Sequence, residues 1–208
     1  MKLNLLKVIN LLVLVFMFNS ITAQSDFYNW TFKFGGGSAR IATSGALYDW
    51  YGNGKGPQIF VAAGYKNILL NVTTSYFNEA TKTDLDYNGL IIPEKTDTRM
   101  VYLNISVSYE QEIGMRFFLE PYVGYVMDRI TTNAIGFMGD EVEIIRDING
   151  MAVGLNIIKY IKFYDALFIG PYFNTYYNFL PYNNINEELP KGSFGYSFGI
   201  ILKATDKQ

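Results

Sequence analysis

The 208-residue chain contains no cysteine and no histidine, and only 17% of its residues are charged. Without cysteine, an exported fold must stand without disulfide bonds, and thiol nucleophiles are excluded. Without histidine, catalysis by a histidine base beside serine or aspartate is excluded, as are histidine-ligated metal sites. Nothing in the sequence places two carboxylates at a defined catalytic separation. We therefore expect a protein that is not an enzyme and that uses no cofactor.

Long apolar runs are also missing, except for one near the N-terminus. Residues 11–18 read LLVLVFMF, with Lys2 and Lys7 ahead of them and small residues behind. This order predicts a secretory signal peptide over 1–23, because eight apolar residues are too few to span a bilayer as a helix. The predicted mature domain is 24–208. The signal holds two of the 17 basic residues and none of the 19 acidic ones, so the mature net charge is −4, which argues against a nucleic-acid partner.

Aromatic residues are abundant, with 17 tyrosines, 16 phenylalanines and 2 tryptophans, and apolar residues recur at alternate positions. Such alternation is typical of strands whose two faces meet different surroundings. Tight turns and long links alternate strictly between the predicted strands, as short periplasmic turns and long extracellular loops do in outer-membrane barrels. The strands are predicted at 27–40, 57–66, 67–77, 98–110, 115–128, 149–160, 164–179 and 192–204. The long links are 41–56, 78–97, 129–148 and 180–191.

The two faces of every predicted strand differ in the same way. One face is apolar and uncharged, with aromatic residues toward the strand ends, and the other is rich in glycine, serine and asparagine. In 192–204, for example, Phe194, Tyr196 and Phe198 alternate with Gly195 and other small residues. The pattern predicts an all-β fold, an eight-stranded antiparallel up-and-down transmembrane barrel with lipid outside and a narrow lumen. The alternative is an exported soluble barrel of lipocalin type, which binds a hydrophobic ligand inside.

The signal ending TAQ, the eight-strand plan and the stretch FFLEPYVGY at 117–125 resemble the outer-membrane β-barrel domain family of small porin-like barrels, with OmpA/OmpX-type architecture. The resemblance implies an outer-membrane location, insertion by the barrel-assembly machinery and a structural, adhesive or weakly pore-forming role. Such barrels often end on an aromatic residue that serves as the assembly signal. This chain runs on through KATDKQ, so that signal is expected a few residues inside, at Phe198 to Leu202.

Two prolines stand in the middle of predicted strands, Pro121 in FFLEPYVGY and Pro171 in LFIGPYFNTYY. In a closed barrel each proline removes one hydrogen bond from the strand ladder. A β-bulge at each proline is the expected accommodation.

Five charged residues fall on the predicted inner face, namely Lys33, Lys66, Arg116, Glu120 and Lys203. Three of them are expected to form a cluster, Lys33 on the first strand and Arg116 and Glu120 on the fifth. An unpaired charge in a narrow lumen is costly, so we expect ion pairs among them. The cluster either fills the core of the barrel or acts as a gate for small solutes.

The first long link carries three aromatic residues, Tyr48, Trp50 and Tyr51. They are expected either to contact a glycan, a partner or the membrane surface, or to fold down over the barrel mouth. The sequence does not identify an extracellular partner.

The second long link contains Asp84, Asp86, Asn88 and Gly89, which match the opening of a calcium-binding loop. The match ends there, because the twelfth position is Lys95. The alternative is a type I′ hairpin turn at Asn88 and Gly89. The four long links together hold 12 acidic and 6 basic residues, a charge that suits association with lipopolysaccharide through bridging cations.

Overall fold

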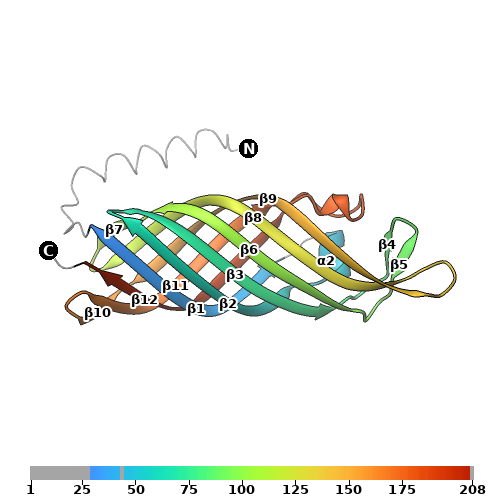
Figure 1. Ribbon diagram of the computed structural model, residues 1–208, viewed down its shortest axis with the longest axis horizontal. Helices are drawn as coiled ribbons and strands as arrows, with labels where there is room; N and C mark the ends of the chain where they lie inside the picture. The colour runs from blue at the N-terminus through green and yellow to red at the C-terminus, as the bar shows by residue number, and fades with distance from the viewer. Residues whose placement is uncertain (1–28, 43–44, 207–208) are drawn as a thin grey trace, which may run out of the picture.

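The computed structural model describes residues 29–42 and 45–206, which form an antiparallel sheet closed into a barrel (Figure 1). The barrel closes because the last strand, β12, pairs with the first, β1, along the whole length of both. The signal peptide predicted at 1–23 lies outside the described residues. Within the described ranges, no helix has the length and apolar character needed to cross a membrane.

All eight predicted strands are present, and the predicted all-β barrel is confirmed. Two strands are interrupted once, so that β6 continues as β7 and β9 continues as β10. The tight turns, the start of β1 and the end of β12 lie at one end of the barrel, here called the short-turn end, and the opposite end is the long-loop end (Figure 1). The strands are β1 (Trp30–Ala42), β2 (Gly54–Tyr65), β3 (Ile68–Ala80), β6 (Asp97–Tyr109), β7 (Gln111–Gly114), β8 (Phe117–Ile135), β9 (Glu141–Lys159), β10 (Ile161–Tyr164), β11 (Leu167–Phe179) and β12 (Ser193–Thr205).

The outer face of the barrel carries the apolar side chains. Phe34 and Phe198 are 55% and 52% exposed, whereas the inward-facing Lys33 and Ser197 are 3% and 0% exposed. A lipocalin-type barrel needs a polar exterior, so that alternative is not favoured. Exposed aromatic rings lie near both ends of the apolar belt, as in the aromatic girdles of membrane barrels. They are Trp30, Tyr65, Tyr109 and Phe117 toward the short-turn end, and Tyr76, Tyr125, Tyr177 and Phe194 toward the long-loop end.

Glycines on the inner face give room to tyrosine rings from the neighbouring strands. A Cβ on Gly195 of β12 would come within 2.2 Å of the Tyr176 ring of β11. A Cβ on Gly154 of β9 would come within 2.4 Å of the Tyr122 ring of β8. Because these distances are far shorter than van der Waals contact, any larger residue would displace the ring. The small residues of the inner face are therefore a condition for filling the lumen with aromatic side chains.

The two mid-strand prolines occupy equivalent places in two successive hairpins. Strand β8 passes Pro121 without a register shift against β9, and β11 passes Pro171 without one against β12. On the other side of each proline the partner strand is interrupted instead, at Glu110 between β6 and β7 and at Tyr160 between β9 and β10. The expectation of a bulge at each proline is therefore wrong, because the ladder breaks locally where the donor is missing. The register shifts lie nearer the turns, at Glu112/Gly114 and Lys162/Tyr164.

The long-loop end holds structure that the alternation did not predict. Much of the link expected at 129–148 is strand, because β8 and β9 each extend for 19 residues and project beyond the barrel as a ribbon (Figure 1). The polarity of the two faces inverts there, with Ile130 and Ile144 buried inside and an Arg129–Asp147 ion pair outside. The remaining elements are α2 (Ala46–Trp50), β4 (Leu85–Tyr87), β5 (Leu90–Ile92) and the 3₁₀ turn η1 (Tyr182–Asn184).

Candidate functional site

Four charged side chains form a buried cluster in the lumen, near the short-turn end. The Nζ of Lys33 lies 2.7 Å from Oε1 of Glu110 and 2.5 Å from Oε2 of Glu120. Lys203 forms a second ion pair with Glu110, and the Oγ of Ser108 donates a hydrogen bond to Glu120 at 2.7 Å. None of the four charged residues is more than 5% exposed. The two cations and two carboxylates balance, which is the condition under which buried charges are tolerated.

The structure brings together only two of the three charges predicted to meet in the lumen. Lys33 and Glu120 are in contact, but Arg116 lies exposed in the turn between β7 and β8. Glu110 takes the central place in the cluster instead. Glu110 was expected at the end of the predicted strand 98–110 and was not counted among the inward-facing charges. Counting by twos from the inward-facing Ser108 was the available signal, because it places residue 110 on the inner face.

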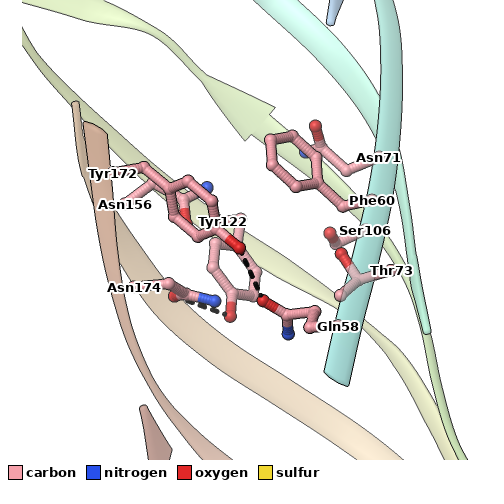
Figure 2. A pocket seen from close by; sticks show the side chains of 9 residues that line it. All are labelled: Gln58, Phe60, Asn71, Thr73, Ser106, Tyr122, Asn156, Tyr172 and Asn174. Carbon is pink, nitrogen blue, oxygen red and sulfur yellow. Dashed lines mark hydrogen bonds between the residues drawn. The ribbon is translucent and has the colours of Figure 1, made fainter. Parts of the chain in front are cut away.

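Amide side chains and aromatic rings fill the middle of the lumen (Figure 2). The hydroxyl of Tyr172 donates to Oε1 of Gln58 at 3.0 Å, and that of Tyr122 donates to Oδ1 of Asn174 at 3.2 Å. The cavity among these side chains has a volume of about 20 Å³, enough for about one water molecule. A space of this size does not admit solutes larger than water. Its other lining residues are Phe60, Asn71, Thr73, Ser106 and Asn156.

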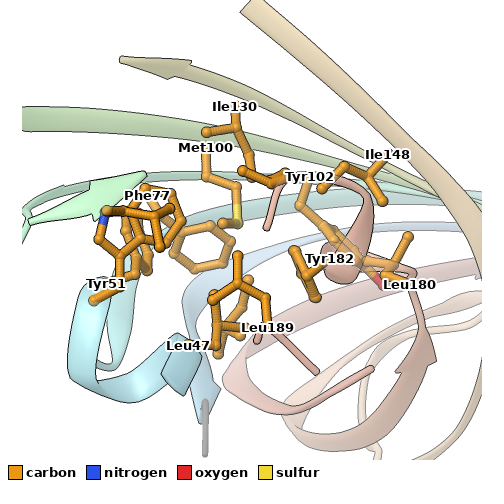
Figure 3. Close-up of a cluster of buried hydrophobic side chains, with 14 of the residues drawn as sticks. Leu47, Tyr51, Phe77, Met100, Tyr102, Ile130, Ile148, Leu180, Tyr182 and Leu189 are labelled. Atoms are coloured by element: carbon orange, nitrogen blue, oxygen red, sulfur yellow. The ribbon is translucent and has the colours of Figure 1, made fainter. Parts of the chain in front are cut away.

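A hydrophobic cluster closes the long-loop end of the barrel (Figure 3). Two segments lie over the opening, 45–52 with α2 and 180–191 with η1, and together they are here called the cap. Their apolar side chains pack against Phe77, Met100 and Ile130 of the barrel wall. Burial of this apolar area holds the cap down. The buried cap residues are Leu47, Trp50, Tyr51, Leu180, Tyr182, Ile185 and Leu189.

One carboxylate, that of Asp128 on β8, lies inside this hydrophobic cluster and is 0% exposed. The hydroxyl of Tyr182 donates a hydrogen bond to its Oδ2 and lies 3.5 Å from the Oγ of Ser193. Among the described residues, Oδ1 of Asp128 has no hydrogen-bond partner. Burial, and the Asp128 carboxylate next to it, raise the pKa of Tyr182 well above its usual value. Tyr182 therefore stays a neutral donor and fastens the cap to the wall.

The aromatic residues of the first long link divide between the two expected roles. Trp50 and Tyr51 fold down over the mouth and are each 1% exposed. Tyr48 points outward, 42% exposed, with the Nζ of Lys82 4.1 Å from the centre of its ring. Of these three aromatic residues, Tyr48 is the one whose side chain is accessible at the surface.

The candidate calcium-binding residues build a hairpin turn between β4 and β5. Oδ1 of Asp86 accepts a hydrogen bond from the backbone N–H of Gly89, and Oδ1 of Asp84 accepts one from Glu94. Asn88 and Gly89 both have positive φ, of 53° and 82°, as a type I′ turn requires. Within the described ranges, no three acidic, histidine or cysteine side chains are grouped to hold a metal ion.

The tip of the β8–β9 ribbon is the most exposed apolar feature of the long-loop end. Phe137 is 102% exposed and Met138 is 93% exposed. They stand between Gly136 and Gly139, and the acidic residues Asp140, Glu141 and Glu143 follow them. This pair was not predicted from the sequence, because residues 129–148 were expected to be a long link rather than a paired ribbon.

Solved structures share this architecture. The outer membrane protein OprG from Pseudomonas aeruginosa matches with a TM-score of 0.57 at 11% identity, over 86% of this chain and 98% of that one. A major outer membrane protein from Thermus thermophilus matches with a TM-score of 0.52 at 14% identity, over 83% and 98%. The chain has the fold of a small outer-membrane β-barrel.

Ail, the attachment invasion locus protein of Yersinia pestis, matches with a TM-score of 0.50 at 10% identity, over 84% of this chain and 97% of that one. That protein was crystallised with the heparin analogue sucrose octasulfate. At such identities the likeness shows a shared fold and nothing about ligands. No protein-family model matches the chain, and no curated protein matches it.

Proposed function

We propose that this protein is a non-enzymatic outer-membrane barrel that recognises a partner at the cell surface and does not conduct solutes. In this proposal the signal peptide at 1–23 is cleaved, the assembly machinery inserts the barrel, and the long-loop end faces outward. The apolar belt, the aromatic girdles and the shared fold of outer-membrane proteins support this placement.

The observation that carries the proposal is the contrast between a filled lumen and a projecting ribbon. The lumen is occupied by the ion cluster, the tyrosine–amide layer and the cap. The ribbon presents Phe137 and Met138 to solvent beyond the barrel. Exposed apolar residues at the end of a long, paired ribbon are costly to keep in water and suit contact with a partner. Recognition therefore belongs to the outer surface, and a pore function is disfavoured.

The net negative charge of the long-loop end favours some classes of partner over others. The long links hold 12 acidic and 6 basic residues, so a sulfated sugar like the one bound by Ail is not the expected ligand. A protein surface that combines an apolar pocket with basic residues matches the tip and its acidic flank better. Around the barrel, the same acidic rim suits lipopolysaccharide bridged by divalent cations.

Adhesion of bacteria that display the protein tests surface recognition. The cells are offered surfaces coated with a basic amphipathic peptide or with heparin, and are compared with cells that display F137S/M138S at the same level. We expect retention on the peptide only, reduced several-fold in the variant. As a matched control, a third strain displays Y48S, which removes the exposed aromatic ring of the first long link. Equal retention of all three strains on both surfaces contradicts the proposal.

Conductance across planar bilayers tests the closed lumen separately. The reconstituted wild-type protein is expected to give no stable single-channel steps. Steps that persist at neutral pH and scale with salt concentration would support a pore instead.

A further inference from the structure

A second cavity opens at the short-turn end, on the opposite side of the ion cluster from the cap. Its volume is about 290 Å³, close to the lower limit for small-molecule sites. Its lining side chains come from five strands, β7, β8, β10, β11 and β12, from the turn after β7 and from the interruption between β9 and β10. Three of the lining residues are cationic and one is acidic. The lining residues are Glu112, Arg116, Phe118, Tyr160, Lys162, Phe168 and Lys203.

The inner wall of this cavity places Lys203, which is paired with Glu110, among aromatic rings. Lys203 is 4% exposed, and its Nζ lies 4.8 Å from the ring centre of Phe118 and 5.0 Å from that of Tyr160. The hydroxyl of Tyr160 donates to Glu110 at 3.2 Å, which ties the wall to the ion cluster. The rings of Phe118, Tyr160 and Phe168 pack edge to face with one another in sequence. The cavity therefore combines a buried, paired lysine with aromatic sides.

Arg116 at the rim is held in place by its backbone, while its guanidinium remains unpaired. Its N–H donates to Oε1 of Glu112 at 3.2 Å, and its carbonyl accepts from the N–H of Tyr160 at 3.0 Å. In the part of the chain that the structure describes, no carboxylate lies within ion-pair distance of the guanidinium. A guanidinium with free donors in a fixed fork suits an oxyanion.

The turn that carries Arg116 has an unfavourable backbone conformation. Met115 and Arg116 have φ values of 48° and 60°, in the left-handed region that favours glycine or asparagine. Tight hairpin turns require this conformation, and Lys66 in another tight turn has a φ of 56°. The turn therefore sets where Arg116 stands at the rim of the cavity.

Lys162 supplies the second cation of the rim. It is exposed, and its Nζ is 3.9 Å from Oδ1 of Asp165, at the limit of an ion pair. Such a contact leaves the ammonium group able to turn toward a ligand. Arg116 and Lys162 come from the two equivalent hairpins whose partner strands break opposite the prolines, and both cations line the same cavity.

We propose that this cavity binds a phosphate group, with Arg116 and Lys162 at the rim donating hydrogen bonds to its oxygens. Any apolar part of the ligand lies against Phe118 and Phe168. The phosphate can come from a soluble phosphate compound or from the headgroup of a phospholipid in the leaflet at this end of the barrel.

Backbone amide NMR shifts of the full mature chain in a maltoside detergent test the proposal. Inorganic phosphate, glycerol 3-phosphate and a short-chain phosphatidylglycerol are titrated separately at constant ionic strength. We expect saturable shifts confined to residues 111–118, 160–168 and 203. Tighter binding of the lipid indicates a headgroup site, and equal binding of all three probes indicates a soluble phosphate site.

Two variants provide the control on charge. R116Q/K162Q removes both rim cations and is expected to weaken phosphate binding by at least about tenfold, because charge-assisted hydrogen bonds are lost. K55Q/K191Q removes the same charge from exposed positions at the long-loop end and is expected to leave binding unchanged. Shifts that do not saturate, or that weaken equally in both variants, overturn the proposal.

A third variant separates loss of binding from loss of folding. R116G removes the guanidinium but suits the left-handed backbone, so it is expected to fold at least as stably as the wild type while phosphate binding falls. A stable R116G that keeps wild-type affinity also overturns the proposal.

Discussion

The phenol of Tyr182, in the loop after β11, donates a hydrogen bond to the carboxylate of Asp128 in the barrel wall, 54 residues earlier in the chain. Both residues are 0% exposed, so this polar contact lies inside the hydrophobic cluster that closes the long-loop end. It helps to fix a segment that is also held by apolar packing and by a hydrogen bond from Nδ2 of Asn186 to the carbonyl of Asp86.

Replacing Tyr182 by phenylalanine is expected to loosen the cap. The variant keeps the ring but leaves the buried Asp128 carboxylate without its donor, which costs about 1–3 kcal/mol. Hydrogen exchange of residues 180–191 should accelerate accordingly, while exchange within β1, β2 and β3 stays unchanged. In D128L/Y182F the two losses should not add, because each single change removes the same hydrogen bond. Strictly additive losses would mean that the two residues are not coupled.

The ion cluster should respond differently to losing one partner and to losing a pair. K33M leaves Glu110 and Glu120 buried with too little positive charge, a situation that costs about 3–5 kcal/mol. The double change K33M/E120L removes one charge of each sign and should recover most of that loss. Urea unfolding of each variant in lipid vesicles, monitored by the migration of the barrel on an unboiled gel, measures both free energies of unfolding. A K33M barrel as stable as the wild type would show that the cluster contributes little.

The cap should loosen at high pH. Burial raises the pKa of Tyr51 and of Tyr182 above the value of about 10 that tyrosine has in an unfolded chain. The contribution of these two neutral tyrosines to the stability of the docked cap is therefore complete below pH 10. It is lost as the pH rises toward their folded-state pKa values, because their hydroxyls ionise more readily when the cap is undocked. The fluorescence of the buried Trp50 in a W30F background reports undocking. We expect a change above pH 10 that is smaller in Y51F/Y182F, and an identical change in both proteins would contradict the assignment.

Gly195 should tolerate no side chain while Tyr176 is present. In G195V the new atoms overlap the Tyr176 ring, so the yield of folded barrel should fall sharply. The double change G195V/Y176A should restore part of the yield, because the ring that clashes is gone. Refolding into vesicles, scored as the fraction of heat-modifiable protein, gives the comparison.

Sequence alternation predicted the barrel well because one environment, lipid, lies outside every strand in the belt. Phe32 and Phe34 on β1 are exposed outward as predicted, and the same rule placed Lys33 and Glu120 in the lumen. The rule weakened beyond the belt, where water replaces lipid outside the ribbon. There Ile130 and Ile144 turn inward, so the apolar face changes sides within one strand.

The candidate sites were predicted less well, because they depend on contacts between distant segments. Nothing local in the sequence indicates that Trp50 packs into the mouth while Tyr48 stays outside. Arg116 is inward by alternation in the predicted strand 115–128, but β8 begins at Phe117, so Arg116 lies in the turn, where alternation does not apply. Glu110 was not predicted in the cluster because its strand was expected to end at residue 110. The strand instead continues past Glu110 as β7.

Quenching of tryptophan fluorescence by brominated lipids tests the central claim, that the aromatic side of the sheet faces hydrocarbon around a closed interior. Trp30 is 52% exposed on the outer girdle, and Trp50 is 1% exposed inside the cap, so the single-tryptophan variants W50F and W30F report on the two surroundings. In reconstituted vesicles we predict strong quenching of Trp30 by lipid brominated near the headgroup and almost none of Trp50. Equal quenching of the two, or a Trp30 signal that lipid bromination leaves untouched, would contradict the account.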